Sequence, residues 1–454
     1  MPQLIDTGNV KRTAASPTIL SFPGDAGYDD ARRAWNLAID QRPAAVAMPE
    51  SVDDVVAAVD YARTVGLRVA VQGTGHGARH DLLDGTLLIN TARMTGVAVD
   101  AEARVARVAA GTIWIDVVDA AVEHGLTALH GSAPDVGVVG YSLGGGIGWL
   151  ARKHGLSASS VLSAEVVTAD GEVVRADPET NPDLFWALKG GGGSFGVVTE
   201  LEIALYPVAE AFAGWLVWPM DRAAEVLGAW AAWTRQVPEE VTSVGRMLQL
   251  PPIPEMPPAL RGRQVVVVEA TYLGDEESGR ALLQPLLDLE PEIDTFAVVP
   301  ARALTDLHQD PPTAVPAVGD GWMLDAFDGS AAEALVDVAA MDGTSPLLSV
   351  EVRHLDGALG RPDSNGGVLS HFEAPYVMYS VGVPMGPVTK DAIDSGVGDI
   401  RNALQPWLSQ GTYFNFADTD VESSSLYPDG VFGRLAEVRA EVDPDGLFRA
   451  RHTI

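Results

Sequence analysis

The chain of 454 residues contains no cysteine, so disulfides, thiolate metal sites and cysteine nucleophiles are excluded, and we expect no bound metal. Long apolar runs are also missing, because none reaches the roughly 18 residues that a helix needs to cross a bilayer. The segment MPQLIDTGNVKRTAAS lacks the apolar centre of an export signal. We therefore expect a cytoplasmic protein that does not associate with membranes.

Basic residues are scarce, with 30 Lys+Arg against 62 Asp+Glu and a formal net charge of −32. The resulting field repels nucleic acid, so no nucleic-acid partner is expected. The acidic residues are scattered, which is more typical of a solvated acidic surface than of a site for a cationic substrate. A hydrophobic content of 47% and a charged content of 20% predict a soluble globular protein, and the length predicts two domains or one composite unit.

Local signals in the first third of the chain alternate between helix and strand. Ser51 and Asp54 form a capping-box pattern ahead of valines at helical spacing, and Gly66 suits the end of that helix. The apolar run LRVAVQ then predicts a buried strand that ends at Gln72. Further along, Asp170-Gly171 predicts the turn of a hairpin.

A glycine loop at residues 73–78 follows this strand and fits the pattern G-x-G-x-x-A of dinucleotide-binding folds. Such a fold needs a full helix next and an acidic residue about 20 positions on. The chain offers only ARHDLLDG and then a strand that ends in Asn90, and it has no G-x-x-x-x-G-K-[ST] motif. A P-loop is therefore excluded and a Rossmann unit is disfavoured.

Two more glycine-dense stretches follow, around Gly145 and Gly192. Three such loops in one half of the chain indicate that backbone approaches a large ligand along its length. In so acidic a protein, neutral N–H groups are well suited to hold a pyrophosphate, so a bulky anionic cofactor is the favoured interpretation. The alternative is that glycine serves the tight packing of short strands.

Five segments together resemble FAD-linked oxidases of the berberine-bridge-enzyme type, within the vanillyl-alcohol-oxidase superfamily of PCMH-type FAD-binding proteins. They stand in the family's order and reach both ends of the chain: VQGTGHG, VGVVGYSLGGGIGWLARKHGLS, NPDLFWALKGGGGSFGVVTE, TYFNF and EVDPDGLFRARHTI. The segment VEVRHLDGALGR is also similar to the bacterial branch of this group.

The resemblance implies an α+β fold with two parts. A PCMH-type FAD-binding domain would be built from both chain ends, residues 1–207 and 396–454. A substrate-binding domain, residues 208–395, would place a large antiparallel sheet, covered by helices, over the flavin ring. The composition changes after Pro207, which agrees with the first boundary.

The resemblance also implies a covalent bond between His76 and the 8-methyl group of the flavin. Neutral imidazole is a nucleophile near pH 7, which suits this role. Many relatives have a second tether through a cysteine, but Ala133 stands at that position here, so the attachment is single at most. By the same resemblance, the residues expected to hold FAD are Gln72, Gly73, Thr74, Gly75, His76, Gly77, Val136, Gly137, Gly140, Tyr141, Gly144, Gly145, Gly148, Val198 and Asn415.

Two tyrosines are the candidate catalytic residues. Tyr413 matches a tyrosine that serves as the base in carbohydrate-oxidising relatives, although a phenol with an unperturbed pKa of about 10 must first lose its proton. Tyr376, in the strand PYVMYSV, is the candidate helper. The charges at Glu351, Arg353 and His354 alternate along a strand, which is more typical of a solvated face than of a pocket.

These observations predict an FAD-dependent oxidase that takes a hydride from a small or medium organic alcohol, sugar or amine and reduces O₂ to H₂O₂. Val136 matches a position at which relatives control the access of oxygen, and valine there is compatible with oxidase activity. The alternatives are a dehydrogenase that uses another electron acceptor and a flavin-binding protein without turnover. The choice of substrate depends on side chains of residues 208–395.

Overall fold

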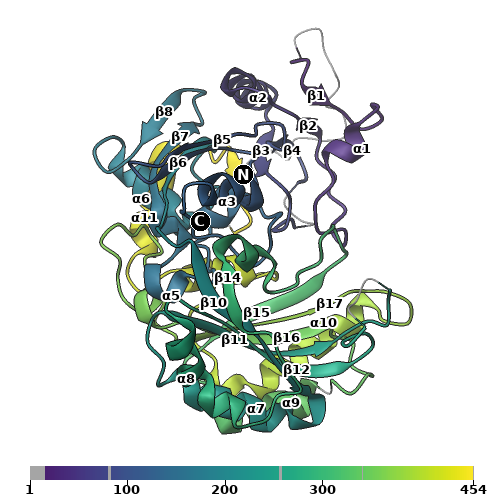
Figure 1. Ribbon diagram of the computed structural model, residues 1–454. Coiled ribbons are helices and arrows are strands. Elements are labelled where there is room, and N and C mark those ends of the chain that lie inside the picture. The colour runs from purple at the N-terminus through teal and green to yellow at the C-terminus, as the bar shows by residue number, and fades with distance from the viewer. Residues whose placement is uncertain (1–15, 80–82, 255–257, 340, 453) are drawn as a thin grey trace.

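The structure is a computed structural model that describes residues 16–79, 83–254, 258–339, 341–452 and 454. All but the last residue of the amino-terminal segment MPQLIDTGNVKRTAAS lies outside these ranges, as does part of ARHDLLDG. Within them, three sheets organise the fold. In Figure 1 two sheets lie in the upper half of the molecule and the third lies in the lower half, with its helices at the bottom.

The first sheet joins the two ends of the chain. Its strands are β1 (Leu20–Ser21), β2 (Ala45–Ala47), β3 (Arg68–Gln72), β4 (Thr86–Asn90) and β18 (Phe448–Arg449), and its helices are α1 (Tyr28–Ala31) and α2 (Val52–Val65). The strand order is β1-β2-β4-β3-β18, in which β2, β4, β3 and β18 run parallel. The capping box of Ser51 and Asp54 and the left-handed end at Gly66 are both present, as predicted.

The second sheet is antiparallel, in the order β5-β6-β9-β7-β8. These strands are β5 (Val97–Asp100), β6 (Val105–Ala109), β7 (Val161–Val167), β8 (Val173–Ala176) and β9 (Val197–Ala204). The hairpin of β7 and β8 turns at Gly171 with φ +81°, which confirms the predicted turn. The core that packs against the second sheet includes side chains from helices α3 (Trp114–Val122), α4 (Val138–Leu143), α6 (Pro182–Gly191) and α11 (Phe432–Val442).

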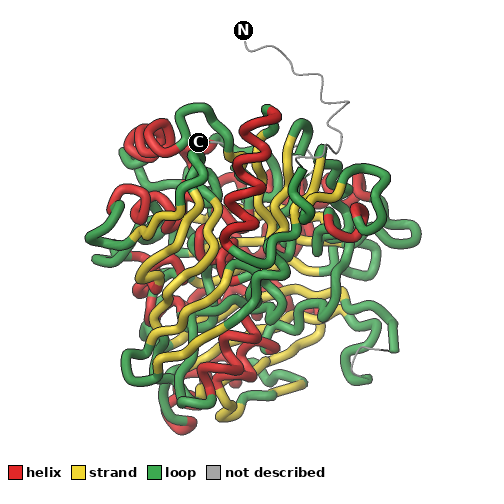
Figure 2. The backbone as a smooth tube through the Cα atoms, turned by 90° about the horizontal axis from the view of Figure 1, so that it is seen from above, coloured by secondary structure: helices red, strands yellow, loops and turns green. Residues whose placement is uncertain are grey.

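The third sheet is the large antiparallel sheet that the resemblance predicted. Its order is β13-β10-β12-β11-β16-β17-β15, and β14 pairs with β10. The strands are β10 (Glu210–Pro219), β11 (Val241–Gln249), β12 (Gln264–Tyr272), β13 (Ile293–Asp294), β14 (Ala297–Pro300), β15 (Val318–Leu324), β16 (Ser349–His354) and β17 (Tyr376–Gly382). In the view from above, strands form broad bands flanked by helices (Figure 2).

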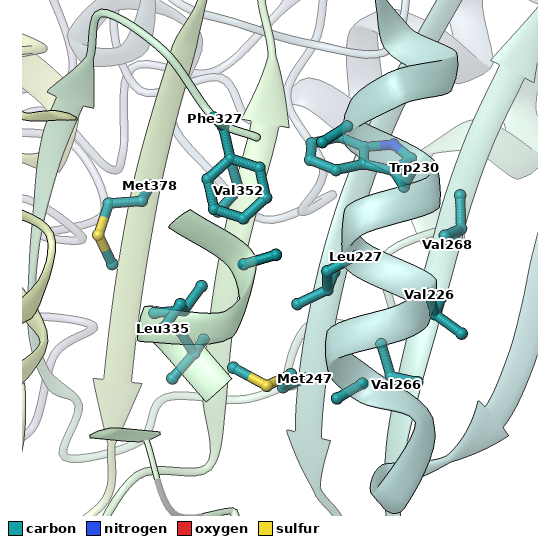
Figure 3. Close-up of a cluster of buried hydrophobic side chains, with 14 of the residues drawn as sticks. Val226, Leu227, Trp230, Met247, Val266, Val268, Phe327, Leu335, Val352 and Met378 are labelled. Atoms are coloured by element: carbon teal, nitrogen blue, oxygen red, sulfur yellow. The ribbon is translucent and has the colours of Figure 1, made fainter. Parts of the chain in front are cut away.

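Four helices cover one face of this sheet: α7 (Ala223–Thr234), α8 (Glu276–Leu287), α9 (Gly329–Ala339) and α10 (Lys390–Ala403). Figure 3 shows Leu227 and Trp230 of α7 facing Met247, Val266 and Val268 of the strands. Each such buried side chain contributes about 2 kcal/mol. None of the helices formed by the described residues combines the length and apolarity required to cross a bilayer.

The predicted domain boundary at residues 395 and 396 is corrected by α10, because it falls inside this helix. Ile393 and Ile400, from the two halves of the helix, pack in the same core beneath the third sheet. A boundary that leaves this core whole would come after Leu408, because Leu404 belongs to the core and Trp407 and Leu408 pack against it. The division into two domains otherwise stays a prediction.

Short turns complete the architecture. They are α5 (Ala151–His154) and the 3₁₀ segments η3 (Ser157–Ser160), η4 (Met220–Arg222), η5 (Ala301–Asp306), η6 (Gly357–Gly360), η7 (Gln405–Trp407), η8 (Phe414–Phe416) and η9 (Ser423–Leu426). The uncovered face of the third sheet meets the glycine loops through a mixed cluster that includes Ile147, Leu369, Val377 and Tyr413.

Candidate functional site

The first glycine loop follows β3 directly. Gly75 adopts φ +87°, and a Cβ atom there would lie 2.8 Å from Ala34 Cα, so the position requires glycine. Gly73 is different, because the atom nearest to its Cβ position lies 3.9 Å away. The loop is therefore tightly packed at Gly75, whereas a Cβ at Gly73 would make only an ordinary van der Waals contact.

Two residues of this loop that were expected to hold FAD have other partners. Gln72 is buried, and its side chain accepts a hydrogen bond from Gln41 Nε2 at 2.6 Å and donates one to Arg33 O at 3.0 Å. That side chain therefore fastens the preceding loop, and the contact of Gln72 with FAD stays a prediction. A Cβ on Gly77 would lie 2.8 Å from Nη1 of Arg451, so Gly77 packs against the carboxyl-terminal segment.

His76 lies among three side chains. Its ring stacks on that of Trp35 with a centroid separation of 4.1 Å and an interplanar angle of 19°. Its Nδ1 atom is 2.8 Å from Thr74 Oγ1, and its Nε2 atom is 3.4 Å from Asp135 Oδ1. Trp35 Nε1 donates to the other oxygen of Asp135 at 2.5 Å. Burial opposes the charge of Asp135, but the neighbouring His76 and Trp35 outweigh it and keep the pKa of that carboxyl below its usual value.

The second glycine loop surrounds α4. A Cβ on Gly144 would lie 1.9 Å from Asn415 Oδ1, and Gly145 adopts φ +101°, so both positions require glycine. At Gly137 the nearest atom lies 3.8 Å from the Cβ position, and at Gly140 nothing lies within 4 Å. The loop thus packs tightly at Gly144 and Gly145 and leaves its backbone open at Gly140.

Buried polar atoms without a hydrogen-bond partner among the described residues gather beside these loops. They include Tyr141 Oη and His130 Nε2. His130 Nδ1 donates to Gly131 O at 2.6 Å, so Nε2 is an acceptor, whereas burial raises the pKa of Tyr141 well above its usual value and keeps it an O–H donor. An unsatisfied buried polar group costs about 1–3 kcal/mol. These atoms and the open glycines fit a flavin nucleotide, which has acceptors and donors along its length.

The third glycine stretch is packed within the protein. Gly190 has φ +107°, and Gly192 donates its N–H to Leu143 O at 2.9 Å. A Cβ on Gly192 would lie 2.5 Å from the ring of Phe414. Close packing, which was the alternative interpretation, therefore explains Gly190 and Gly192, whereas nothing lies within 4 Å of the Cβ position of Gly193. Val198 of β9 is buried, with its side chain in the core of the second sheet, so only its backbone is available to a ligand.

Tyr413 and Asn415 are brought to the second glycine loop by η8. Asn415 Nδ2 lies 3.1 Å from Tyr141 O and 3.1 Å from Tyr413 Oη, and it donates to both. The Tyr413 ring is buried and packs edge-on against Phe416 with a centroid separation of 5.0 Å. Burial raises the pKa of Tyr413 to about 12, although Asn415 and Arg353 act in the opposite direction. The phenol is therefore protonated at neutral pH.

Tyr376 lies on the other face of the third sheet, so its expected helper role is corrected. Its ring is 6.0 Å from that of Trp230 in the helix-covered core, and its hydroxyl is 2.7 Å from Thr234 Oγ1. Side chains alternate along a strand, and the next residue, Val377, packs in the cluster that holds Tyr413.

Tyr379 is the tyrosine of β17 that faces the site. Its ring lies 4.9 Å from that of Phe416, and its hydroxyl donates to Asp418 Oδ2 at 2.6 Å. Burial, together with Asp418, raises the pKa of Tyr379 well above its usual value. It therefore stays protonated and holds the segment after η8 against the sheet.

The charged residues of β16 are buried in a network, which corrects the interpretation of a solvated face. Arg353 Nε donates to Glu351 at 2.7 Å, and Glu351 also bonds His308 Nε2 at 2.9 Å. His308 Nδ1 bonds Glu269 at 2.5 Å, and Arg246 donates to the same Glu269 at 3.0 Å. Burial and Arg246 oppose the charge of His308, but the two glutamates raise its pKa to about 9. His308 is therefore charged at neutral pH.

Arg353 connects this network to the glycine loops. A cavity between the second loop and the third sheet is lined by Ser132, Ile147, Gly148, Trp149, Thr242, Ser243, Val244, Arg353 and His354. Gly148, one of the expected cofactor residues, and Arg353 of the charged network thus line the same cavity. Sequence reasoning missed Trp35, His308 and Tyr379, because no motif contains them, and passed over Asp135 within SAPDVG.

Comparisons with known proteins agree with this arrangement. The family model described as "FAD binding domain" matches residues 43–177, and the one described as "Berberine and berberine like" matches residues 412–454. The (R)-6-hydroxynicotine oxidase of Paenarthrobacter nicotinovorans is 37% identical over 199 residues, which is 43% of either chain. The glucooligosaccharide oxidase of Sarocladium strictum is 27% identical over 93% of this chain and 89% of its own.

Solved structures share the fold over almost the whole chain. Wild-type Physcomitrella patens BBE-like 1 has a TM-score of 0.83 at 22% identity and covers 96% of both chains. The 6-hydroxy-D-nicotine oxidase from Arthrobacter nicotinovorans has a TM-score of 0.81 at 24% identity and covers 95% of this chain and 96% of its own. The chain is therefore an FAD-linked oxidoreductase that resembles the berberine-bridge-enzyme-like group in its two matched regions and shares the fold of that group.

Proposed function

We propose that this protein is an oxidase that takes a hydride from a small or medium organic alcohol, sugar or amine and reduces O₂ to H₂O₂. FAD, when bound, would accept the hydride and pass two electrons on to O₂. The chain supplies the position of the substrate and a place for its proton. We further propose that FAD is attached through His76 alone.

The observation that carries the proposal is the position of Tyr413. Its buried phenol lies where η8, the second glycine loop and the third sheet meet, in a cluster with Ile147 and Val377. A substrate held in that place would give its O–H or N–H proton to Tyr413 Oη. The phenol must first be ionised, and the hydrogen bond from Asn415 and the charge of Arg353 both favour its ionised form.

The named relatives support two substrate classes. The relative from Paenarthrobacter is named for a hydroxynicotine, and the one from Sarocladium for glucooligosaccharides. Both a cyclic amine and a sugar are therefore reasonable substrates for a first screen. The hydroxynicotine oxidase aligns over only 43% of its length, whereas the sugar oxidase aligns over 89% of its length. The first therefore supports an amine substrate no more strongly than the second supports a sugar.

A substrate screen tests the activity. The purified protein would be mixed without oxygen with primary alcohols, mono- and oligosaccharides, and cyclic and linear amines, and loss of the yellow flavin absorbance would identify substrates. Air would then be admitted in a stopped-flow instrument while peroxide is measured with a coupled peroxidase. Fast reoxidation with one H₂O₂ per turnover is expected. Slow reoxidation by air with fast reoxidation by a quinone dye would indicate a dehydrogenase, and no bleaching by any compound would indicate a flavin carrier.

Acid precipitation tests the attachment. The natural chain is expected to give a yellow pellet, whereas His76→Ala should release its flavin into the supernatant. His124→Ala serves as the matched control, because His124 is exposed two residues after the end of α3. A colourless pellet from the natural chain would contradict covalent attachment.

A further inference from the structure

Three side chains from separate segments fix the position of the His76 ring. Trp35, which follows α1, stacks on the ring, and its backbone N–H donates to Thr74 O at 3.0 Å. Thr74 Oγ1 contacts Nδ1, and Asp135, from the segment before α4, lies beside Nε2. Since Trp35 Nε1 also donates to Asp135, one indole holds both the imidazole and the carboxylate. This inference rests on the proposed attachment of FAD to His76.

The partners of the two ring nitrogens indicate the tautomer of His76. Asp135 is a carboxylate that only accepts hydrogen bonds, and its Oδ1 lies 3.4 Å from Nε2 without a hydrogen bond between them, so we assign the hydrogen of the neutral ring to Nε2, where the carboxylate favours it. The hydroxyl of Thr74 can donate, and it lies 2.8 Å from Nδ1. Nδ1 therefore carries the lone pair, and it is the nucleophilic atom of the ring.

We propose that Asp135 accepts the Nε2 proton of His76 during FAD attachment and that Trp35 positions both groups. Nδ1 forms a C–N bond to the 8-methyl carbon of FAD. One C–H bond of that methyl group and the Nε2–H bond break. The two electrons pass through the flavin ring to O₂, which takes up the two protons and leaves as H₂O₂. The side chains of His76 and Asp135 are 22% and 27% exposed, so solvent reaches the pair even though Nε2 and Oδ1 themselves are buried.

The arrangement is suited to attachment rather than to holding FAD. Asp135 and Trp35 contact the His76 ring, whereas the open backbone that could hold a nucleotide without a covalent bond lies at Gly140 of α4. Removal of the carboxylate should therefore slow bond formation and leave non-covalent binding in place. A residue with a merely structural role would change both together.

The test compares the natural chain with Asp135→Asn, Asp135→Ala, Trp35→Phe and, as a matched control, Asp116→Asn at an exposed position of α3. Each protein is incubated with excess FAD in air, and flavin retained after acid precipitation is followed with time. Total flavin after gel filtration gives the non-covalent binding. Asp135→Ala is also incubated with sodium formate, which supplies a small carboxylate, against sodium chloride at equal ionic strength.

We expect both Asp135 variants to hold FAD but to attach it at least about tenfold more slowly, and formate to accelerate Asp135→Ala. Trp35→Phe keeps an aromatic ring but loses the N–H to Asp135, so its rate should fall less, and Asp116→Asn should match the natural chain. Attachment at the natural rate in Asp135→Asn, no effect of formate, or loss of all FAD from both Asp135 variants would overturn the proposal. A natural chain that releases its flavin in acid would instead contradict the proposed function.

Discussion

The guanidinium carbon of Arg353 lies 5.0 Å from the centroid of the Phe416 ring. Tyr413 packs against the same phenylalanine, so the buried cation and the candidate base share one neighbour. Through Glu351 and His308, this cation is held by a network that spans three strands of the third sheet.

Replacement of Arg353 by Met should slow flavin reduction by substrate at pH 7 by about tenfold or more, because a buried cation favours the ionised form of Tyr413. Arg353→Lys should keep most of the rate. The measurement is the anaerobic bleaching rate in a stopped-flow instrument. Since Arg353→Met leaves Glu351 with fewer partners, stability should fall by about 3 kcal/mol, and the double variant with Glu351→Gln separates that loss from the kinetic effect.

Loss of the Tyr413 hydroxyl should be the most damaging single change to the reaction. Tyr413→Phe keeps the packing against Phe416, and we expect flavin reduction to slow by about 10²–10⁴-fold. Tyr376→Phe is the matched control on the other face of the sheet. It should leave the reduction rate unchanged and cost about 1 kcal/mol of stability, because its hydroxyl bonds Thr234 in the core. Equal rates in Tyr413→Phe and the natural chain would exclude Tyr413 as the base.

The pH dependence of the reaction follows from the same phenol. With a pKa of about 12, Tyr413 is almost entirely protonated below pH 9, and its ionised fraction rises tenfold for each pH unit. The logarithm of the flavin-reduction rate should therefore rise with a slope near one between about pH 6 and pH 9, without a plateau. A flat profile in the natural chain would show that another group receives the proton.

The network around His308 should make the free energy of unfolding fall as the pH rises. The pKa of His308 is raised to about 9 in the fold, above its usual value of 6.5. Its stabilisation is therefore complete below pH 6.5, and it is lost as the pH rises through 9. Urea unfolding of the natural chain and His308→Gln should differ by about 3 kcal/mol at pH 6, and the difference should shrink above pH 9. A constant difference would mean that His308 is neutral.

Two helical glycines test the open backbone of the second loop. No atom lies within 4 Å of the Cβ position of Gly140 in α4 or of Gly433 in α11. Alanine at either position should preserve or raise the stability of the protein without FAD, by up to about 1 kcal/mol. Only Gly140→Ala should weaken FAD binding, measured by fluorescence titration with His76→Ala as the background that prevents attachment. Equal affinities in the two variants would move the FAD site away from Gly140.

Features that depend on nearby sequence were predicted well. The capping box at Ser51, the left-handed helix end at Gly66 and the turn at Gly171 all arise from a few neighbouring residues. The helix-covered antiparallel sheet was also predicted, although through resemblance to a family and not through periodicity.

Features that depend on distant partners were predicted poorly. The strand PYVMYSV has apolar and aromatic residues on both faces, so its sequence does not reveal that Tyr376 faces the helices and Tyr379 the site. The charges of Glu351 and Arg353 looked solvated because their partner, His308, comes from a separate segment of the chain. Likewise, Gly192 makes room for Phe414, from the opposite end of the chain.

The pairing of β18 with β3 has a consequence for biosynthesis. Phe448 lies opposite Val69, and Arg68 Nη1 donates to Asp445 O across 377 positions of sequence. The strand that leads into the first glycine loop thus lacks one neighbour until almost the whole chain has left the ribosome. Contacts of such separation form late and slowly. The support of the first glycine loop is therefore completed only once residues 448 and 449 have been synthesised.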